Sequence, residues 1–274
     1  MKFIEIIKYD IKNGILRNKY LFISVIVISV LFVTDHSVNM LRYDIDCSYG
    51  DVLMYIYGGM KKYVASRGNR FQFPAIWTVL FITQLSGTLN YPYKDLNSYG
   101  IQILFRTDNR LLWWISKFIW NIIYGIIYHS FIWTVMFIYA VISGYAINFS
   151  IDIKILCNIF EIFPEDISGN ITDIPVYIFF VPVLTSVVFS LLEMTVSLFI
   201  KTVYSFLLMS CLVISSAYLM TDYIIGNYGM IIRSNHILTD GINMERGIII
   251  LSVLVITAFI VGLIKFSKYD IINS

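Results

Sequence analysis

The stretch that decides the fold is residues 111 to 141, which reads LLWWISKFIWNIIYGIIYHSFIWTVMFIYAV. A helix needs about 20 mainly apolar residues to cross the roughly 30 Å hydrocarbon core of a bilayer. This stretch is longer, so it must tilt or begin outside the membrane. Five further apolar stretches lie at 20–34, 74–91, 176–200, 203–220 and 247–266. The sequence therefore predicts an all-α integral membrane protein with six transmembrane helices.

The composition agrees with this prediction. The chain is 58% hydrophobic and 14% charged, whereas an average soluble domain has roughly 45 to 50% apolar and about 25% charged residues. Aromatic residues make up 16%, and Trp and Tyr favour the headgroup layer of a membrane. The 274 residues suit a single membrane domain, 1–274, which excludes a soluble globular enzyme.

The connections between the spans predict the orientation. They lie at 35–73, 92–110, 143–175 and 222–246, with a tight link at Lys201 and Thr202. Six spans put both termini on one side, and assigning that side to the cytoplasm collects most of the Lys and Arg residues there. Because cytoplasmic loops carry an excess of Lys and Arg, we expect a protein of the cytoplasmic membrane with both termini inside. The outer loops are then 35–73, 143–175 and 222–246.

Residues 1–19 carry an amphipathic pattern. Isoleucines recur at helical spacing, with lysines on another face. Such a pattern is typical of a helix that lies in the inner headgroup layer and enters the first span as an elbow. An ordinary basic flank that holds the topology is the alternative. The residues concerned are Ile4, Ile7, Ile11 and Ile15 on the first face and Lys8, Lys12 and Lys19 on the second.

Motifs for catalysis and metal binding are missing from the sequence. It contains no G-x-x-x-x-G-K-[ST] phosphate-binding loop and no H-E-x-x-H. Cys47, Cys157 and Cys211 match no zinc or redox spacing, although a disulfide between the first two remains an open alternative because both fall on the predicted outer side. His129 is expected to be a packed histidine. We therefore expect neither an enzyme nor a metal site.

Small polar residues and one carboxylate share a face of the fourth span. Because a charged group is costly in hydrocarbon, this face should point at protein or water. It could be the wall of a substrate path or a packed helix interface, with Glu193 reaching toward Lys201. The second span also has a polar face, which could line a path but is more typical of interhelical hydrogen bonds. These residues are Ser186, Ser190, Glu193 and Ser197 on the fourth span and Gln84 and Thr88 on the second.

The inner loop 92–110 has more features than a simple connection needs. It combines a turn, a short half-apolar segment at Gly100 to Phe105 and alternating charges at Arg106, Asp108 and Arg110. These features predict a docking surface for a cytosolic protein, and a positive-inside loop with interface anchors is the alternative. Residues 223–232 are too apolar for a free loop and too short for a span, so they should dip back into the membrane.

This layout resembles the type 2 permeases of ATP-binding-cassette (ABC) exporters. The elbow at 1–19, six spans, a coupling element at about 92–110 and a half-re-entrant hairpin at about 223–235 carry the resemblance. It implies a homodimer or heterodimer of permeases, with ATP and Mg²⁺ bound by separate cytosolic ATPase subunits and no cofactor in this chain. It also implies that the coupling residues Arg106, Asp108 and Arg110 face the ATPase and that Gln84, Thr88, Ser210 and Ser215 lie near the substrate route. The 35–73 loop is longer than in many members, which leaves its role in substrate capture or release open.

The expected function is that of a permease subunit that exports a hydrophobic or peptide substrate by alternating access. The lipid bilayer and the ATPase are its partners, and no nucleic acid is expected. One rival is an ion-coupled secondary carrier with Glu193 as its proton site, which needs inverted repeats or broken helices that are not clear in the sequence. A second rival is a membrane scaffold or sensor subunit that transports nothing.

Overall fold

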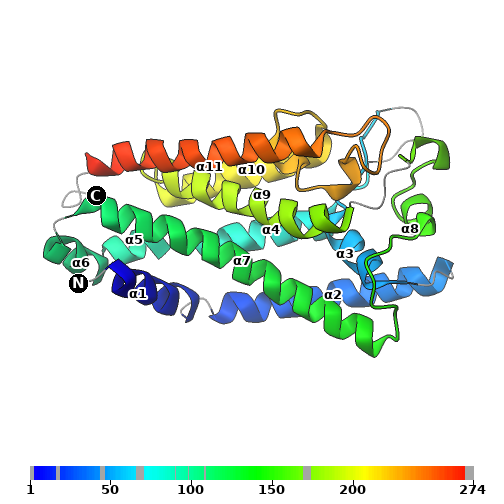
Figure 1. Cartoon of the computed structure of the whole chain (residues 1–274), viewed down its shortest axis with the longest axis horizontal. Coiled ribbons are helices and arrows are strands. Elements are labelled where there is room, and N and C mark those ends of the chain that lie inside the picture. Colours follow the sequence, from blue (N-terminus) through cyan, green and yellow to red (C-terminus); the bar gives the residue numbers. More distant parts are fainter. Residues whose placement is uncertain are drawn as a thin grey trace.

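The computed structural model describes residues 3–16, 19–43, 47–65, 71–89, 91–97, 99–107, 109–168 and 174–268. Within these ranges the regular structure is helical, with isolated β-bridges only. The helices form an elongated bundle, in which the start of α1 (Phe3–Leu16) and the end of α11 (Met244–Ser267) lie at the same end (Figure 1). The prediction of an all-α protein is confirmed.

In the part of the chain that the structure describes, four helices are long and apolar enough to cross a membrane. They are α2 (Lys19–Tyr43), α7 (Arg110–Ile142), α9 (Ile174–Val196) and α11. The other two predicted spans are the shorter helices α4 (Ala75–Thr88) and α10 (Thr202–Tyr218). At 1.5 Å per residue α4 extends about 21 Å, less than the roughly 30 Å hydrocarbon core. The structure therefore supports a membrane protein with four candidate spans and does not establish six.

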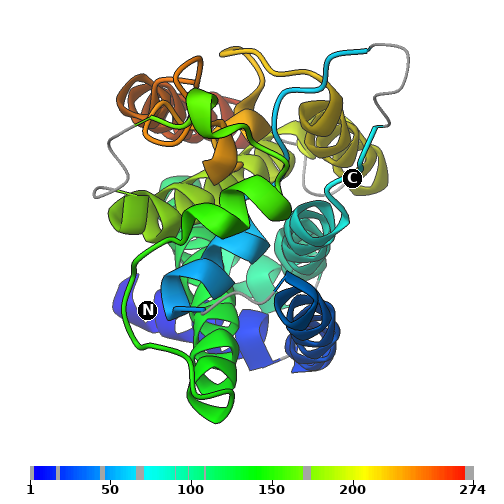
Figure 2. The same cartoon turned by 90° about the vertical axis from the view of Figure 1, so that its right-hand side faces the viewer.

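Short helices cover the two ends of the bundle (Figures 1 and 2). One end, here called the α5 end, has α1 together with α5 (Tyr91–Leu96) and α6 (Tyr99–Thr107). The opposite end, called the α3 end, has α3 (Tyr49–Tyr57), α8 (Ile153–Asn158) and, among the described residues, three 3₁₀ helices. These are η1 (Pro164–Asp166), η3 (Ile225–Asn227) and η4 (Ile231–Arg233).

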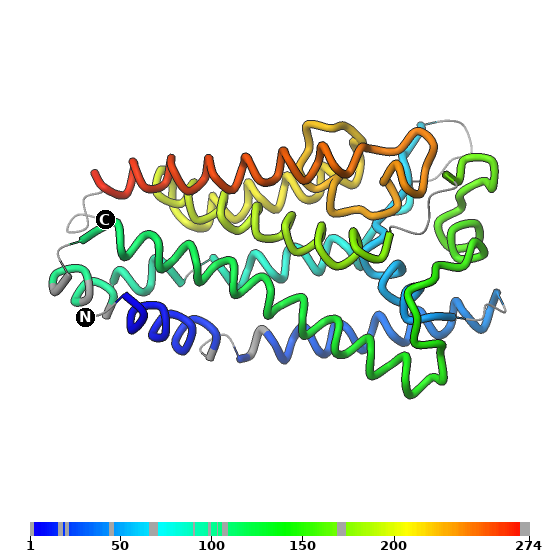
Figure 3. Tube along the Cα trace, viewed as in Figure 1, coloured from blue at the N-terminus to red at the C-terminus, as the bar shows by residue number. Residues whose placement is uncertain are grey.

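Helix α7 runs the length of the bundle, packing on α1 with its first half and on α2 with its second (Figure 3). Asn109 caps its start, where the side-chain oxygen accepts a hydrogen bond from Leu112 N at 3.2 Å. Residues every four positions along it are buried, which is the spacing of one helix face. They are Trp120, Tyr124, Tyr128, Ile132, Met136 and Ala140.

The predicted outer loop 35–73 contains the buried helix α3, which the sequence analysis did not anticipate. Helix α2 continues through it to Tyr43, and every residue of α3 is buried. Ser48 and Asp51 form a reciprocal capping box at the start of α3. The apolar run at 52–57 is too short to span a bilayer, so it packs as a buried helix against α7 and α9.

Helix α1 packs against α7 with a face that the sequence analysis did not single out. Ile6, Asp10 and Gly14 are buried, at i, i+4 and i+8, whereas Ile4 of the predicted apolar face is 63% exposed. The reason is tertiary: Asp10 finds polar partners on its neighbours, and Gly14 admits a tryptophan of α7. The predicted pattern of isoleucines does not decide the packing of this helix.

The open alternative of a disulfide is not realised. Cys47 and Cys157 are both present as thiols, the first buried and the second half-buried.

Candidate functional site

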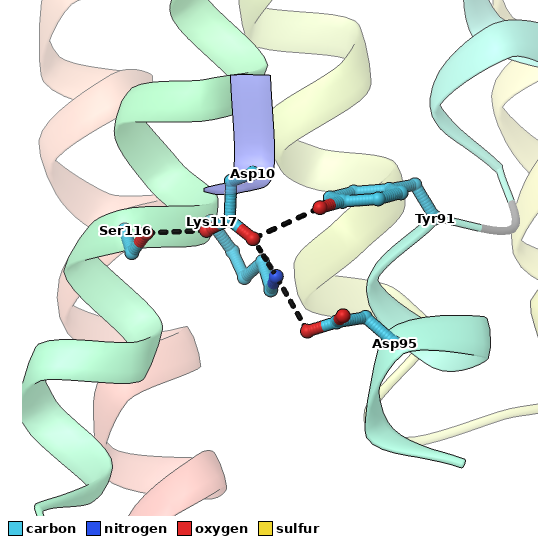
Figure 4. Close-up of polar contacts among 5 residues, drawn as sticks. All are labelled: Asp10, Tyr91, Asp95, Ser116 and Lys117. Atoms are coloured by element: carbon cyan, nitrogen blue, oxygen red, sulfur yellow. Dashed lines mark hydrogen bonds and ion pairs between the residues drawn. The ribbon is translucent and has the colours of Figure 1, made fainter. Parts of the chain in front are cut away.

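Five polar residues from three helices meet inside the α5 end and are called the Lys117 cluster: Asp10, Tyr91, Asp95, Ser116 and Lys117 (Figure 4). The ammonium of Lys117 on α7 forms ion pairs with Asp10 Oδ1 of α1 and, at 2.6 Å, with Asp95 Oδ2 of α5. The three side chains are at most 3% exposed. One cation is therefore held between two carboxylates, away from water.

Neutral donors complete the shell of Asp10. Tyr91 donates its hydroxyl to Asp10 Oδ1 at 2.9 Å, and Ser116 donates to Asp10 Oδ2. Burial, followed by the nearby charges of Asp10 and Asp95, raises the pKa of Tyr91 above its ordinary value, so the phenol keeps its proton and remains a donor. The Lys117 ammonium also lies 4.7 Å from the centre of the Tyr91 ring and 5.1 Å from that of Trp113.

Two glycines let the helices approach closely around this cluster. A Cβ atom on Gly14 would lie 2.1 Å from the indole nitrogen of Trp120, whose ring lies tilted against that of Tyr91 at 4.3 Å between centroids. A Cβ on Gly100 of α6 would lie 2.1 Å from Asp95 Oδ2. The cluster therefore joins α1, α5 and α7 directly, and α6 lies against it through Gly100.

This arrangement has a definite energetic consequence. Removing one partner of a buried ion pair costs about 3 to 5 kcal/mol, because a charge is left without compensation. The intact cluster holds the short helices of the α5 end in one position relative to α7, so a displacement of α5 has to move α1 and α7 or break an ion pair. The cluster is therefore a rigid connection between these helices.

Sequence reasoning missed this cluster, although part of its signal was present. Asp10 shares one helix face with Ile6 and Gly14, and Lys117 lies inside a long apolar stretch. A charged residue in each of these places indicates a buried partner. Which residues pair could not be read from the chain, since Asp10 and Lys117 are 107 positions apart.

The predicted docking residues are placed in part. Arg110 donates to the backbone oxygens of Phe266 at 3.2 Å and Ser267 at 2.9 Å, so it caps the C-terminal end of α11. The side chain of Arg106 and the whole of Asp108 lie outside the described residues.

The predicted polar faces of α4 and α9 meet at one point. Thr88 donates to Glu193 Oε2 at 3.0 Å, and both side chains are buried. Ser205 of α10 donates to the backbone oxygen of Glu193 at 2.7 Å. Glu193 Oε1 and the amide of Gln84, which is fully buried, have no hydrogen-bond partner among the described residues. Glu193 thus contacts α4 rather than Lys201, which is exposed.

The serines of α9 are engaged in local and interhelical hydrogen bonds. Ser186 lies 3.0 Å from His129 Nε2, and His129 Nδ1 lies 2.9 Å from the Tyr57 hydroxyl. Ser190 donates to Asn121 Oδ1 at 2.5 Å, and Ser197 donates to the backbone oxygen of Met194 at 2.7 Å. The bonds of Ser186 and Ser190 connect α9 to α7, whereas Ser197, which directly follows α9, bonds back to the last turn of that helix.

Ser210 and Ser215 are the two residues of α10 that were predicted to lie near the substrate route. Among the described residues, neither forms a hydrogen bond with the serines of the fourth span. Ser210 is 8% exposed, and its hydroxyl has no hydrogen-bond partner within the described ranges. Ser215 donates to the backbone oxygen of Leu212 at 2.9 Å.

A second buried cation, Arg233 of η4, lies near the α3 end. Its side chain is 0% exposed and donates to the backbone oxygens of Ser216 at 2.6 Å, Met60 at 2.8 Å and Ala217 at 3.0 Å, and to the Asn227 side chain. Two of these oxygens belong to the last turn of α10, where a cation is favoured by the helix dipole. This arginine therefore anchors residues 225–233, which overlap the segment 223–232 predicted to dip back into the membrane, against α10.

Comparisons with known proteins find no match to this chain among family models, curated proteins or solved structures.

Proposed function

We propose that the chain is the membrane-embedded permease subunit of an ATP-driven exporter of the type 2 ABC class, with a separate cytosolic ATPase bound at the α5 end. The observation that supports this proposal is the Lys117 cluster, which joins the short helices of that end to α7. A displacement of α5 or α6 would be transmitted through Lys117 to α1 and α7, because the ion pairs join α5, α1 and α7 directly.

The exposed surface of the α5 end is suited to a protein partner. Phe105 of α6 is 71% exposed and Tyr93 of α5 is 43% exposed, while Leu96 and Leu104 of the same helices are buried. Exposed aromatic side chains are enriched at protein interfaces. In this proposal both enter the surface of the ATPase, which supplies the energy because the sequence contains no phosphate-binding loop.

The ion-coupled carrier remains the second candidate, favoured by one observation. Glu193 is 2% exposed, and its Oε1 has no hydrogen-bond partner among the described residues. A buried carboxyl of this kind is a common proton site in carriers. Replacing it with Gln would abolish transport in a carrier and leave an ATP-driven exporter at least partly active.

The proposal is tested by purification from native membranes followed by reconstitution. We expect a soluble ATPase to copurify with the chain, Phe105→Glu to abolish copurification, and the matched exposed control Gln102→Glu on the same helix to retain it. Transport against a gradient by this chain alone, with an ion gradient as the only energy source, would refute the proposal in favour of the carrier.

A further inference from the structure

A cavity of about 270 Å³ opens at the α3 end, opposite the end that holds the Lys117 cluster. Its walls come from five parts of the chain: Asp35 of α2, the end of α3, residues 59–63, residues 72–77 at the start of α4, and the turn at 159–161. The volume is near the lower end of the range for small-molecule sites, about 300 Å³. The cavity is thus large enough for a small organic molecule or part of a longer one.

The inner wall is apolar and aromatic. Ile56, Met60 and Trp77 line it and are themselves buried, while Phe73 and Phe160 also border it. The Trp77 indole donates to the backbone oxygen of Gly229 at 2.8 Å, so this ring is held in place before any ligand arrives. A wall prepared in this way binds apolar groups at little entropic cost.

Charged groups of both signs stand among the lining residues. Asp35 and Glu161 supply two carboxylates, and Lys61 and Lys62 supply two ammonium groups. Lys61 and Glu161 are 3.8 Å apart and both are partly exposed, and the Asp35 carboxylate accepts a hydrogen bond from Tyr55. A lining balanced in this way is complementary to a head group that carries both charges.

Glu161 is held in a strained backbone conformation at this place. Its φ is 53°, in the left-handed region, which costs a non-glycine residue roughly 1 to 2 kcal/mol. Lys61 donates to its backbone oxygen, and Gln72 donates to its Oε1 at 2.8 Å. Three of the five wall segments are therefore joined at one strained residue, and strain retained at the edge of a cavity points to a binding role.

From these observations we infer that the cavity binds a small zwitterionic amphiphile, with its apolar body against Trp77 and Met60 and its head among Asp35, Glu161, Lys61 and Lys62. A short-chain phosphocholine lipid and a hydrophobic dipeptide with free ends both have this chemistry. The inference does not depend on an ATPase partner or on transport.

The test is titration calorimetry on the full chain in maltoside micelles, with dihexanoyl phosphocholine in one arm and leucyl-phenylalanine in the other. Saturable binding in either arm supports the inference and identifies the source as lipid or peptide. Ala75→Trp, which fills the cavity without changing a charge, should weaken that binding at least tenfold, and Asp35→Asn should weaken it several-fold. Glu165→Gln, an exposed acid outside the lining, is the matched control and should leave binding unchanged.

Three outcomes would overturn the inference. They are an absence of saturable binding in both arms, unchanged binding by the correctly folded Ala75→Trp variant, and equally tight binding of octyltrimethylammonium or octanoate, which carry a single charge. Because no arm contains an ATPase, each of these outcomes leaves the proposed function standing.

Discussion

Replacing Lys117 with Met should destabilise this protein more than any other single change of a lysine among the described residues. The substitution keeps most of the apolar stem and removes the ammonium, which leaves the carboxylates of Asp10 and Asp95 facing each other with at most 3% exposure. Leaving a buried ion without its partner costs about 3 to 5 kcal/mol. For a chain of this size 1 kcal/mol corresponds to roughly 2 to 4 °C in Tm, so the expected loss is about 6 to 20 °C.

The measurement is thermal unfolding in detergent micelles, followed by tryptophan fluorescence at a fixed heating rate because membrane proteins often unfold irreversibly. Lys12→Met is the matched control, since Lys12 is exposed on α1 two positions after Asp10. It should change Tm by less than about 2 °C, as surface substitutions usually stay within about 0.5 kcal/mol.

A triple variant separates charge balance from mechanical connection. Asp10→Asn, Asp95→Asn and Lys117→Met together remove all three charges, and replacing a buried ionic group by neutral side chains is often close to neutral in stability. This variant should therefore recover most of the lost Tm. If it stays as unstable as Lys117→Met alone, uncompensated charge is not the cause, and the reasoning about the cluster fails.

Further predictions concern other buried polar groups. Gly100→Ala should lower Tm, because the new Cβ would lie 2.1 Å from Asp95 Oδ2, while Gln102→Ala on the exposed side of α6 should not. Arg233→Met should lower Tm by more than Arg246→Met, since it leaves buried carbonyl oxygens unsatisfied at about 1 to 3 kcal/mol each, whereas Arg246 forms only an exposed 3.8 Å pair with Asp222. Equal shifts for this second pair would contradict the anchoring role of Arg233. Glu193→Gln should leave Tm unchanged or higher, because it replaces a buried carboxyl by a neutral amide of the same shape; a large loss of Tm would mean that the charge is needed for folding.

Burial of Arg233 lowers its pKa to about 10, so the side chain remains charged at neutral pH and loses its proton only above that value. A cation whose folded pKa is depressed binds its proton less tightly in the native state than in the unfolded chain. Protonation of Arg233 by itself therefore lowers the free energy of unfolding as the pH falls toward 10 from above. Thermal unfolding between pH 7 and 9 should therefore show no step from this residue.

The helical nature of the protein and the location of its apolar segments could be predicted from the sequence. The run from Leu111 to Val141 became α7 within one residue at each end, and the polar Asn109 that precedes it became its cap. Helix α3 is harder to predict, because an apolar run of six residues is too short to show a helical period that distinguishes a buried helix from a loop. The lengths of α4 and α10 likewise depend on tertiary packing against neighbouring segments, which the sequence does not specify.

For the candidate sites, the sequence likewise predicts individual residues but not which of them come into contact. Thr88 and Glu193 were both singled out from their spacing on separate helices, but their 3.0 Å contact depends on how α4 packs on α9. The Lys117 cluster was not found at all, since its members lie in segments read separately as an elbow, a loop and a span.

By itself the sequence determined that this chain is helical, that it is too apolar for a soluble protein, and which stretches are long enough to cross a bilayer, because these properties follow from local composition and length. Only the tertiary structure decided which charges are buried together. The helical period predicts which residues share a face of a helix. The residues that pack on that face can lie more than a hundred positions away in the sequence, as Asp10 and Lys117 do.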